Sequence, residues 1–112
     1  MLVASALGKS HEWVLDSGCS FHMTPNRSFL NNYCDCNGGT ILLGDDKPCN
    51  IFGKGSVLYT KDNGTKFTLH DVRCVPNLKR NLISLGHFDD NGYDVKMKNG
   101  VFTVSKDSKV LL

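Results

Sequence analysis

The stretch EWVLDSGCSFHMT, residues 12–24, holds an apolar run that ends in an acid and is followed by a glycine turn. The run Trp13-Val14-Leu15 has the composition of a buried β-strand, and Gly18 permits a sharp turn soon after it. Each reactive side chain in this stretch would define a different class of protein. The candidates are Asp16, Ser17, Cys19, Ser20 and His22.

Length and composition favour one small domain. The chain has 112 residues, 40% of them hydrophobic, and single domains commonly have about 100–150 residues. Residues 1–11 show no periodic pattern, so we expect a flexible N-terminal arm there and one domain over residues 12–112. The 13 basic and 11 acidic residues give a formal net charge of +2. That charge is too weak and dispersed to indicate a nucleic-acid partner.

The cysteine count and the apolar pattern bear on the cellular compartment. Five cysteines are an odd number, and the sequence shows neither a signal peptide nor the roughly 18 apolar residues of a membrane helix. We therefore expect a cytoplasmic, intracellular protein with reduced thiols and no membrane partner.

Most of the chain is typical of short strands. Residues 40–60 contain two apolar runs separated by GDDKP, which is the pattern of a long hairpin. Residues 84–92 predict one short helix, because Leu85 and Phe88 are three positions apart and Gly92 can end it. Many short strands, glycine-rich turns and a single short helix near the C-terminal part predict an all-β fold, either a small closed β-barrel or a sandwich.

Two kinds of reactive site fit the pattern poorly. A serine nucleophile of the hydrolase type requires Gly-x-Ser-x-Gly, but His22 occupies the position of the second glycine. A zinc site would have to use Cys19, His22, Cys34 and Cys36, and the last two are too close together for a standard ligand pair. We therefore predict no bound metal.

Asp16 has two interpretations. An acid between an apolar strand and Ser17-Gly18 is often an ordinary turn that ends the strand. It can also be a reactive carboxylate, oriented by the adjacent hydroxyl and approached closely by backbone at the glycine. A glycine-containing hairpin over 41–57 follows, and then an apolar strand that runs into the predicted helix. This is the order of elements in one half of an aspartic protease.

Three segments carry a more specific pattern, and they occur in a fixed order. They read WVLDSGCSFHMT at 13–24, GGTILLGDDKPCNIFGKGSVLY at 38–59 and DVRCVPNLKRNLISLGHFDDNGYDV at 71–95. Together they resemble the protease segment of the Pol polyprotein of copia-type LTR retrotransposons, most closely those of plants. The resemblance covers residues 12 to about 107, and it implies a closed β-barrel of the retropepsin-like aspartic protease type.

The resemblance also implies roles for individual residues. Asp16 would be the catalytic aspartate, and Ser17 and Gly18 would shape its loop. Residues 81–84 would form an apolar strand beneath that loop. The tip of a flap that covers the substrate would consist of Gly44, Asp45 and Asp46.

Aspartic-protease chemistry implies a partner. It requires two carboxylates that share one proton, and the sequence contains a single Asp-Ser/Thr-Gly, at Asp16. The second Asp16 would come from another copy, in a two-fold homodimer with the site on its axis. No cofactor is needed. The substrate would be an extended polypeptide, by resemblance the Gag-Pol polyprotein, in the cytoplasm or in virus-like particles.

Two alternatives stay open at this point. A barrel of the same fold could serve as a structural or interaction module of a degenerate or host-adopted element without cleaving anything. A zinc-binding nucleic-acid module would need bound metal. The intact Asp16-Ser17-Gly18 favours the peptidase.

Overall fold

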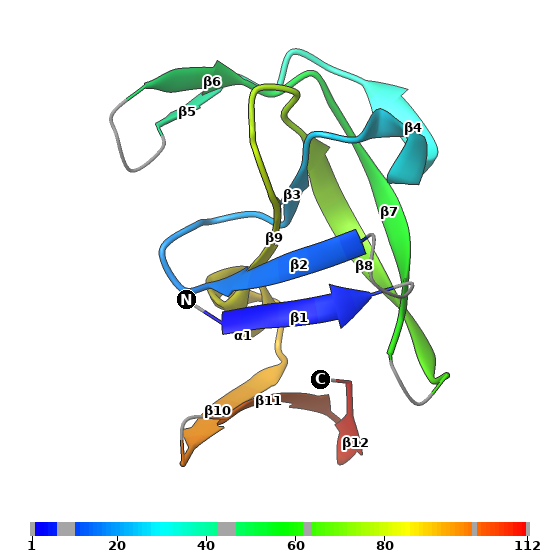
Figure 1. Cartoon of the computed structure of the whole chain (residues 1–112), viewed down its shortest axis with the longest axis vertical. Coiled ribbons are helices and arrows are strands. Elements are labelled where there is room, and N and C mark those ends of the chain that lie inside the picture. Colours follow the sequence, from blue (N-terminus) through cyan, green and yellow to red (C-terminus); the bar gives the residue numbers. More distant parts are fainter. Residues whose placement is uncertain (1, 7–10, 43–46, 62–63, 100, 112) are drawn as a thin grey trace.

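A computed structural model describes residues 2–6, 11–42, 47–61, 64–99 and 101–111 (Figure 1). Short strands dominate the described chain, and α1 is its α-helix. The elements are β1 (Leu2–Ala6), β2 (His11–Asp16), β3 (Met23–Thr24), the 3-10 helix η1 (Arg27–Phe29), β4 (Asn31–Asp35), β5 (Thr40–Leu42), β6 (Pro48–Asn50), β7 (Gly53–Thr60), β8 (Lys66–Cys74), β9 (Asn81–Ser84), α1 (Leu85–Asp90), β10 (Asp94–Lys98), β11 (Val101–Lys106) and β12 (Lys109–Val110).

Seven of the strands form one sheet, in the order β1-β2-β9-β3-β8-β7-β4. The β10-β11-β12 sheet and the β5-β6 hairpin lie toward opposite ends of the molecule's longest axis (Figure 1). The predicted β-rich fold with one short α-helix is confirmed. The barrel is not strictly closed, because β1 and β4 are the edges of the large sheet and do not pair with each other in the described residues.

The N-terminal segment contains a paired strand. β1 runs antiparallel to β2, with Leu2 opposite Leu15 and Ala6 opposite His11. Edge pairing uses main-chain groups and needs no periodic pattern of side chains, so the sequence carries little signal for it. The predicted arm thus includes a strand over Leu2–Ala6, whereas its flexibility and the domain boundary at residue 12 stay predictions.

The main core lies between the large sheet and α1. Trp13, Tyr59, Leu69 and Ile83 are among its most deeply buried side chains. A smaller apolar cluster joins β3, β6 and the segment before β9; its buried members are Met23, Cys49, Ile51, Val75 and Leu78. This second cluster fixes the base of the β5-β6 hairpin against the body of the domain.

The hairpin predicted over 41–57 is wrong in its second half. β5 pairs with β6, with Ile41 opposite Cys49, but β7 leaves this hairpin and pairs with β8 and β4. Gly55 explains how β4 can join β7 at the edge of the large sheet. A Cβ on Gly55 would lie 2.8 Å from the carbonyl oxygen of Asn31, so only glycine lets β4 approach this closely.

The predicted helix over 84–92 is confirmed as α1. Its N-terminus is capped by the Ser84 side chain, its Leu85 and Phe88 are buried, and Gly92 follows with a positive φ of 83°.

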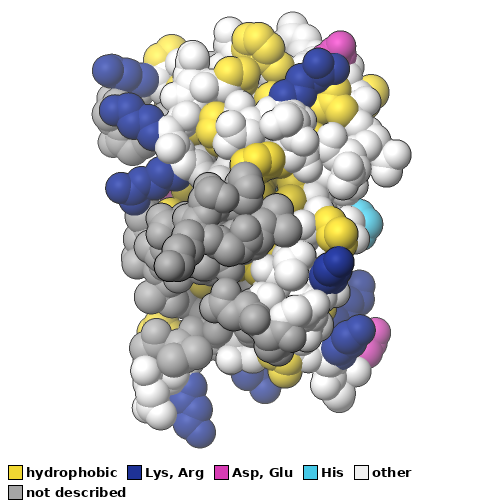
Figure 2. All heavy atoms as spheres, turned by 45° about the vertical axis from the view of Figure 1, so that its right-hand side comes forward, with side chains coloured by type: hydrophobic (Ala, Val, Ile, Leu, Met, Phe, Trp, Pro, Cys, Tyr) yellow, Lys and Arg dark blue, Asp and Glu magenta, His cyan; other side chains and the backbone are white. Residues whose placement is uncertain are grey.

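No helix in the described residues is long and apolar enough to cross a bilayer. Lys and Arg side chains lie in separate groups at the edges of the face in Figure 2, interspersed with apolar and neutral side chains.

Candidate active site

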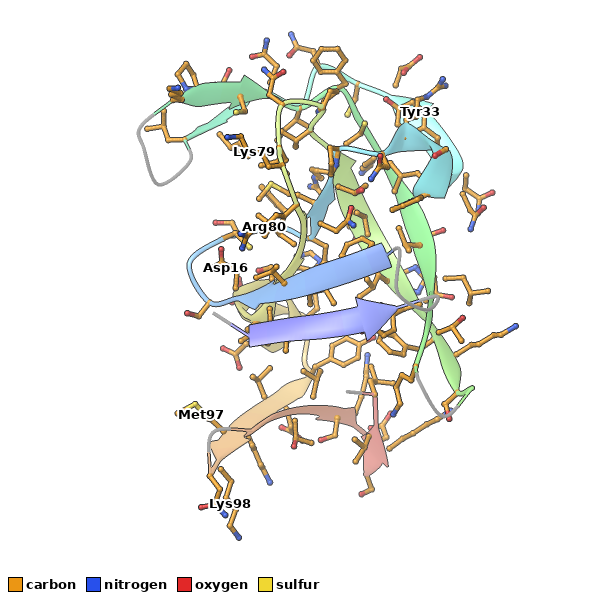
Figure 3. The ribbon with its side chains drawn as sticks, viewed as in Figure 1. Asp16, Tyr33, Lys79, Arg80, Met97 and Lys98 are labelled. Atoms are coloured by element: carbon orange, nitrogen blue, oxygen red, sulfur yellow. The ribbon has the colours of Figure 1, made fainter. Side chains whose placement is uncertain are left out.

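Asp16 is the last residue of β2. β2 runs parallel to β9, which places Asp16 beside Ser84 and Val14 beside Leu82. β3 then lies on the other side of β9, with Met23 opposite Leu82. The loop over 17–22 therefore has to cross the end of β9 on its way from β2 to β3. Figure 3 shows Asp16 on the side of the molecule where the β5-β6 hairpin projects.

The turn after Asp16 holds the carboxylate in one orientation. The backbone N–H of Gly18 donates to Asp16 Oδ1 at 2.7 Å, and a Cβ on Gly18 would lie 3.2 Å from that oxygen. Asp16 is partly exposed, and Ser17 is exposed. In the described residues the orienting donor is thus a main-chain amide, and Ser17 Oγ makes no hydrogen bond. The loop is both an Asx-type turn and a support for the carboxylate.

Ser84 connects this loop to β9 and α1. The Ser84 hydroxyl, which is fully buried, donates to the Cys19 carbonyl oxygen at 2.6 Å. It accepts from the His87 backbone N–H at 3.0 Å, which caps α1. The Ser84 backbone N–H donates to His22 Nδ1 at 2.9 Å. One residue therefore fixes two points of the loop, Cys19 and His22, relative to the strand beside Asp16.

Sequence reasoning missed this role of Ser84, which it placed at the end of an apolar strand and at the start of the predicted helix. A usable signal was present, because serine directly before a predicted helix is a preferred N-cap residue. The link to Cys19, 65 positions earlier in the chain, had no such signal. It follows from the parallel pairing of β2 with β9.

His22 is part of the scaffold of the site. Its side chain is only 1% exposed, and burial, followed by the neighbouring His87 and Arg73, lowers the pKa of His22 to about 3. The ring is therefore neutral near pH 7. Since Nδ1 accepts the Ser84 N–H, the ring proton is on Nε2.

Cys19 is a protonated thiol. Burial, followed by the charge of Asp16, raises the pKa of Cys19 to about 11. A thiol of this kind is a poor nucleophile at neutral pH, because the thiolate is the reactive form. Cys19 therefore contributes contact surface and a carbonyl acceptor to the loop, and the ionisable group that remains at the site is Asp16.

A hollow of about 260 Å³ lies in front of Asp16. Its lining includes the loop and three apolar side chains from separate elements, Met23, Leu42 and Leu82. Leu42 belongs to the β5-β6 hairpin and is 69% exposed. The hairpin and the carboxylate thus face the same space. The predicted flap tip, Gly44, Asp45 and Asp46, lies outside the described residues.

The zinc ligands considered from the sequence are not brought together. Cys19 and His22 belong to the loop after β2, whereas Cys34 and Cys36 lie at the end of β4. No three side chains of His, Cys, Asp or Glu gather closely enough to hold a metal ion in the described part of the chain. The geometry at Asp16 is that of a carboxylate beside an apolar hollow.

Comparison with known proteins identifies the family. Residues 13–93 match the family model described as Pol polyprotein, beta-barrel domain. The chain belongs to this family. The matched residues of this Pol β-barrel domain include the Asp16 loop, β9, α1 and the apolar residues that line the hollow.

Relatives of the Pol β-barrel domain are transposon proteins. The chain is 35% identical over 104 residues to the retrovirus-related Pol polyprotein from transposon TNT 1-94 of Nicotiana tabacum, covering 93% of this chain and 8% of that protein. It is 36% identical over 77 residues to the putative transposon Ty5-1 protein of Saccharomyces cerevisiae, covering 69% of this chain and 49% of that protein. It is also 33% identical over 98 residues to the retrovirus-related Pol polyprotein from transposon RE1 of Arabidopsis thaliana, covering 85% and 6%.

The Pol β-barrel domain therefore corresponds to a small part of the two plant polyproteins and to about half of the yeast protein. No solved structure is significantly similar to it. The resemblance to retrotransposon Pol polyproteins is confirmed at the level of the family.

Proposed function

We propose that this Pol β-barrel domain is one half of an aspartic endopeptidase that acts as a homodimer on a retrotransposon polyprotein. The observation that carries the proposal is the position of Asp16. Its carboxylate stands at the end of a buried strand, is oriented by the Gly18 N–H and opens onto a hollow that the β5-β6 hairpin also lines. This is the arrangement that a water-activating carboxylate beside a peptide substrate requires.

The chemistry needs two such carboxylates. Two carboxyl groups about 3 Å apart share a single proton, because both cannot ionise at that distance. The ionised group takes a proton from a water molecule as the water oxygen attacks the peptide carbonyl carbon. The protonated group donates its proton to the carbonyl oxygen, and the roles then exchange when the C–N bond breaks and the amine leaves.

A second copy of the chain would supply the second carboxylate. The sequence contains a single Asp-Ser/Thr-Gly, so an isologous dimer with the two Asp16 on its axis is the arrangement that completes the site. Asp16 is partly exposed at the end of β2, which supports its approach by a facing copy.

The substrate would be an extended polypeptide held between the hairpin and the two carboxylates. Main-chain hydrogen bonds would supply much of the affinity, and the apolar side chains of Met23, Leu42 and Leu82 would contact substrate side chains. The relatives are Pol polyproteins, which supports a Gag-Pol polyprotein as substrate, in the cytoplasm or in virus-like particles. No cofactor, membrane or direct nucleic-acid contact forms part of this proposal.

The test compares the wild-type chain with Asp16→Asn and Asp89→Asn on a polyprotein fragment. Asp16→Asn keeps the shape of the side chain and removes the ionisable group, so we expect cleavage to fall to background with an unchanged unfolding midpoint. Asp89 is exposed on α1, so its substitution should leave cleavage intact. A statine-type inhibitor should block the wild-type activity.

Equal cleavage by the wild type and Asp16→Asn would overturn the proposal. A folded wild-type chain that cleaves nothing at any concentration would also overturn it. That second result would favour the structural or interaction module instead.

A further inference from the structure

A second hollow, of about 170 Å³, lies against α1 and shares no lining residue with the hollow at Asp16. Buried or half-buried rings form its floor, and polar side chains form its rim. The floor includes His22, His87 and Tyr93, and the rim includes Asp71, Asn91 and Lys106. All of these residues belong to the described part of the chain. The peptidase proposal uses none of this surface.

His22 presents a buried donor that lacks an acceptor. Its Nδ1 is occupied by the Ser84 N–H at 2.9 Å, so the opposite nitrogen, Nε2, carries the ring proton. In the described residues no atom accepts a hydrogen bond from this Nε2–H. Leaving a buried donor unsatisfied costs about 1–3 kcal/mol. A side chain that is 1% exposed and lines a hollow is therefore expected to bind an acceptor from outside the chain.

The polar side chains at the rim of this hollow include a cation, an amide and an acid. The Lys106 ammonium lies 4.7 Å from the centre of the Tyr93 ring, which holds a positive charge at the rim. The Asn91 amide is fixed there, because its Nδ2 donates to the His87 carbonyl oxygen at 2.7 Å. Asp71 is the single acid of the lining, and it is exposed to solvent.

A permanent positive charge lies near His22 as well. After burial and His87, Arg73 lowers the pKa of His22, because its nearby positive charge disfavours the protonated ring. His87 lies edge-on to His22, with ring centres 4.7 Å apart. A negatively charged acceptor would be stabilised in this field.

We propose that this hollow binds a small oxyanion, with one oxygen accepting from His22 Nε2 and the charge of the anion facing Lys106. A water molecule occupies about 30 Å³ of liquid, so 170 Å³ accommodates a phosphate-sized ion with some water. Inorganic phosphate is the simplest probe of this chemistry. His22 also anchors the Asp16 loop, but the inference does not depend on the peptidase proposal, since the hollow is a different one and the readout is binding.

The experiment is a titration of the ¹⁵N-labelled chain with sodium phosphate, against sodium chloride at matched ionic strength. The readouts are the backbone amide and His22 Nε2–H resonances. We expect saturable shifts with phosphate around His22, His87 and Asn91. Lys106→Gln should weaken binding about tenfold, the effect of losing one charge-assisted hydrogen bond. Lys98→Gln removes the same charge from an exposed position on β10 and should leave binding unchanged.

A second variant tests the donor itself. His22→Asn retains a side-chain acceptor for the Ser84 N–H and removes Nε2–H, so it should also weaken binding about tenfold. If His22→Asn fails to fold, the comparison of Lys106→Gln with Lys98→Gln still tests whether phosphate binds in this hollow. Resonance shifts that rise linearly with phosphate, or that are the same with phosphate and with chloride, would overturn the proposal. Equal phosphate affinities of Lys106→Gln and Lys98→Gln would also overturn it. Each of these results would mean that the hollow holds only water.

Discussion

At the scale of single residues, the Asp16 loop is held by hydrogen bonds from residues far away in sequence. Gly18 orients the carboxylate from within the loop, but the loop as a whole is anchored through Cys19 and His22 to Ser84. Because Ser84 also caps α1, the position of Asp16 depends on the junction between β9 and the helix. Changes at this junction should therefore affect the stability of the whole domain.

Replacing Ser84 with alanine tests this dependence. Ser84→Ala removes the N-cap of α1 and leaves the Cys19 carbonyl without its 2.6 Å donor. We expect the free energy of unfolding to fall by about 1–3 kcal/mol, the range for a lost cap and an unsatisfied buried acceptor. Urea unfolding followed by tryptophan fluorescence measures the change, since the buried Trp13 lies opposite Asn81 of β9.

Ser28→Ala is the matched control. Ser28 is exposed in η1, so the same substitution there should change the free energy of unfolding by less than about 0.5 kcal/mol. Indistinguishable unfolding midpoints for Ser84→Ala and Ser28→Ala would show that the Ser84 hydroxyl does not anchor the loop.

At the scale of elements, the sequence predicted those parts whose signal is local. The Trp13-Val14-Leu15 strand and the helix with Leu85 and Phe88 are present because their periodicity and end signals agree with their packing. The division of residues 40–60 between the β5-β6 hairpin and β7 could not be predicted in the same way. Its outcome depends on β8, which pairs along most of β7, and on β4, which joins β7 as the edge strand where Gly55 allows a close approach.

The candidate site likewise has a part that the sequence predicts and a part that it does not. The acid and the turn of Asp16-Ser17-Gly18 are readable from adjacent residues. The contacts that hold them are not, because His22 and Ser84 are 62 positions apart and meet only through the order of strands β2, β9 and β3. Sequence periodicity assigns faces to strands, but it does not give the neighbour of a strand.

The β5-β6 hairpin is the element whose role rests on the proposed function. Leu42 is 69% exposed yet lines the hollow at Asp16, so a bound peptide would cover it. Burying a leucine side chain is worth about 1.5–3 kcal/mol. We therefore expect Leu42→Asn to lower kcat/KM for a peptide substrate about tenfold or more, with little change in the unfolding midpoint.

Leu58→Asn gives the control for that experiment. Leu58 is also exposed, at 44%, but it lies on β7 and does not line the hollow. Its substitution removes a similar apolar side chain from the surface and should leave kcat/KM unchanged. Equal effects of the two substitutions would contradict a substrate-binding role for the hairpin.

At the scale of the whole molecule, the proposed chemistry needs two carboxylates, and the sequence contains a single Asp-Ser/Thr-Gly. A chain of 112 residues is also small enough for association to add substantially to its stability. We therefore expect the active species to be a pair of chains, and the concentration of that pair to set the activity.

Mixing wild-type and Asp16→Asn chains tests the pair directly. At a fixed total concentration far above the dissociation constant of the dimer, random pairing of equal amounts of the two chains gives about one quarter wild-type homodimers. If both Asp16 carboxylates are needed, activity should fall to about a quarter of the value for an equal total of wild-type chains. Independent monomers would retain about half. As a control, mixing wild-type chains with Asp89→Asn chains, which keep Asp16, should retain full activity. A mixture with Asp16→Asn chains that retains half of the wild-type activity would contradict a site shared by two chains.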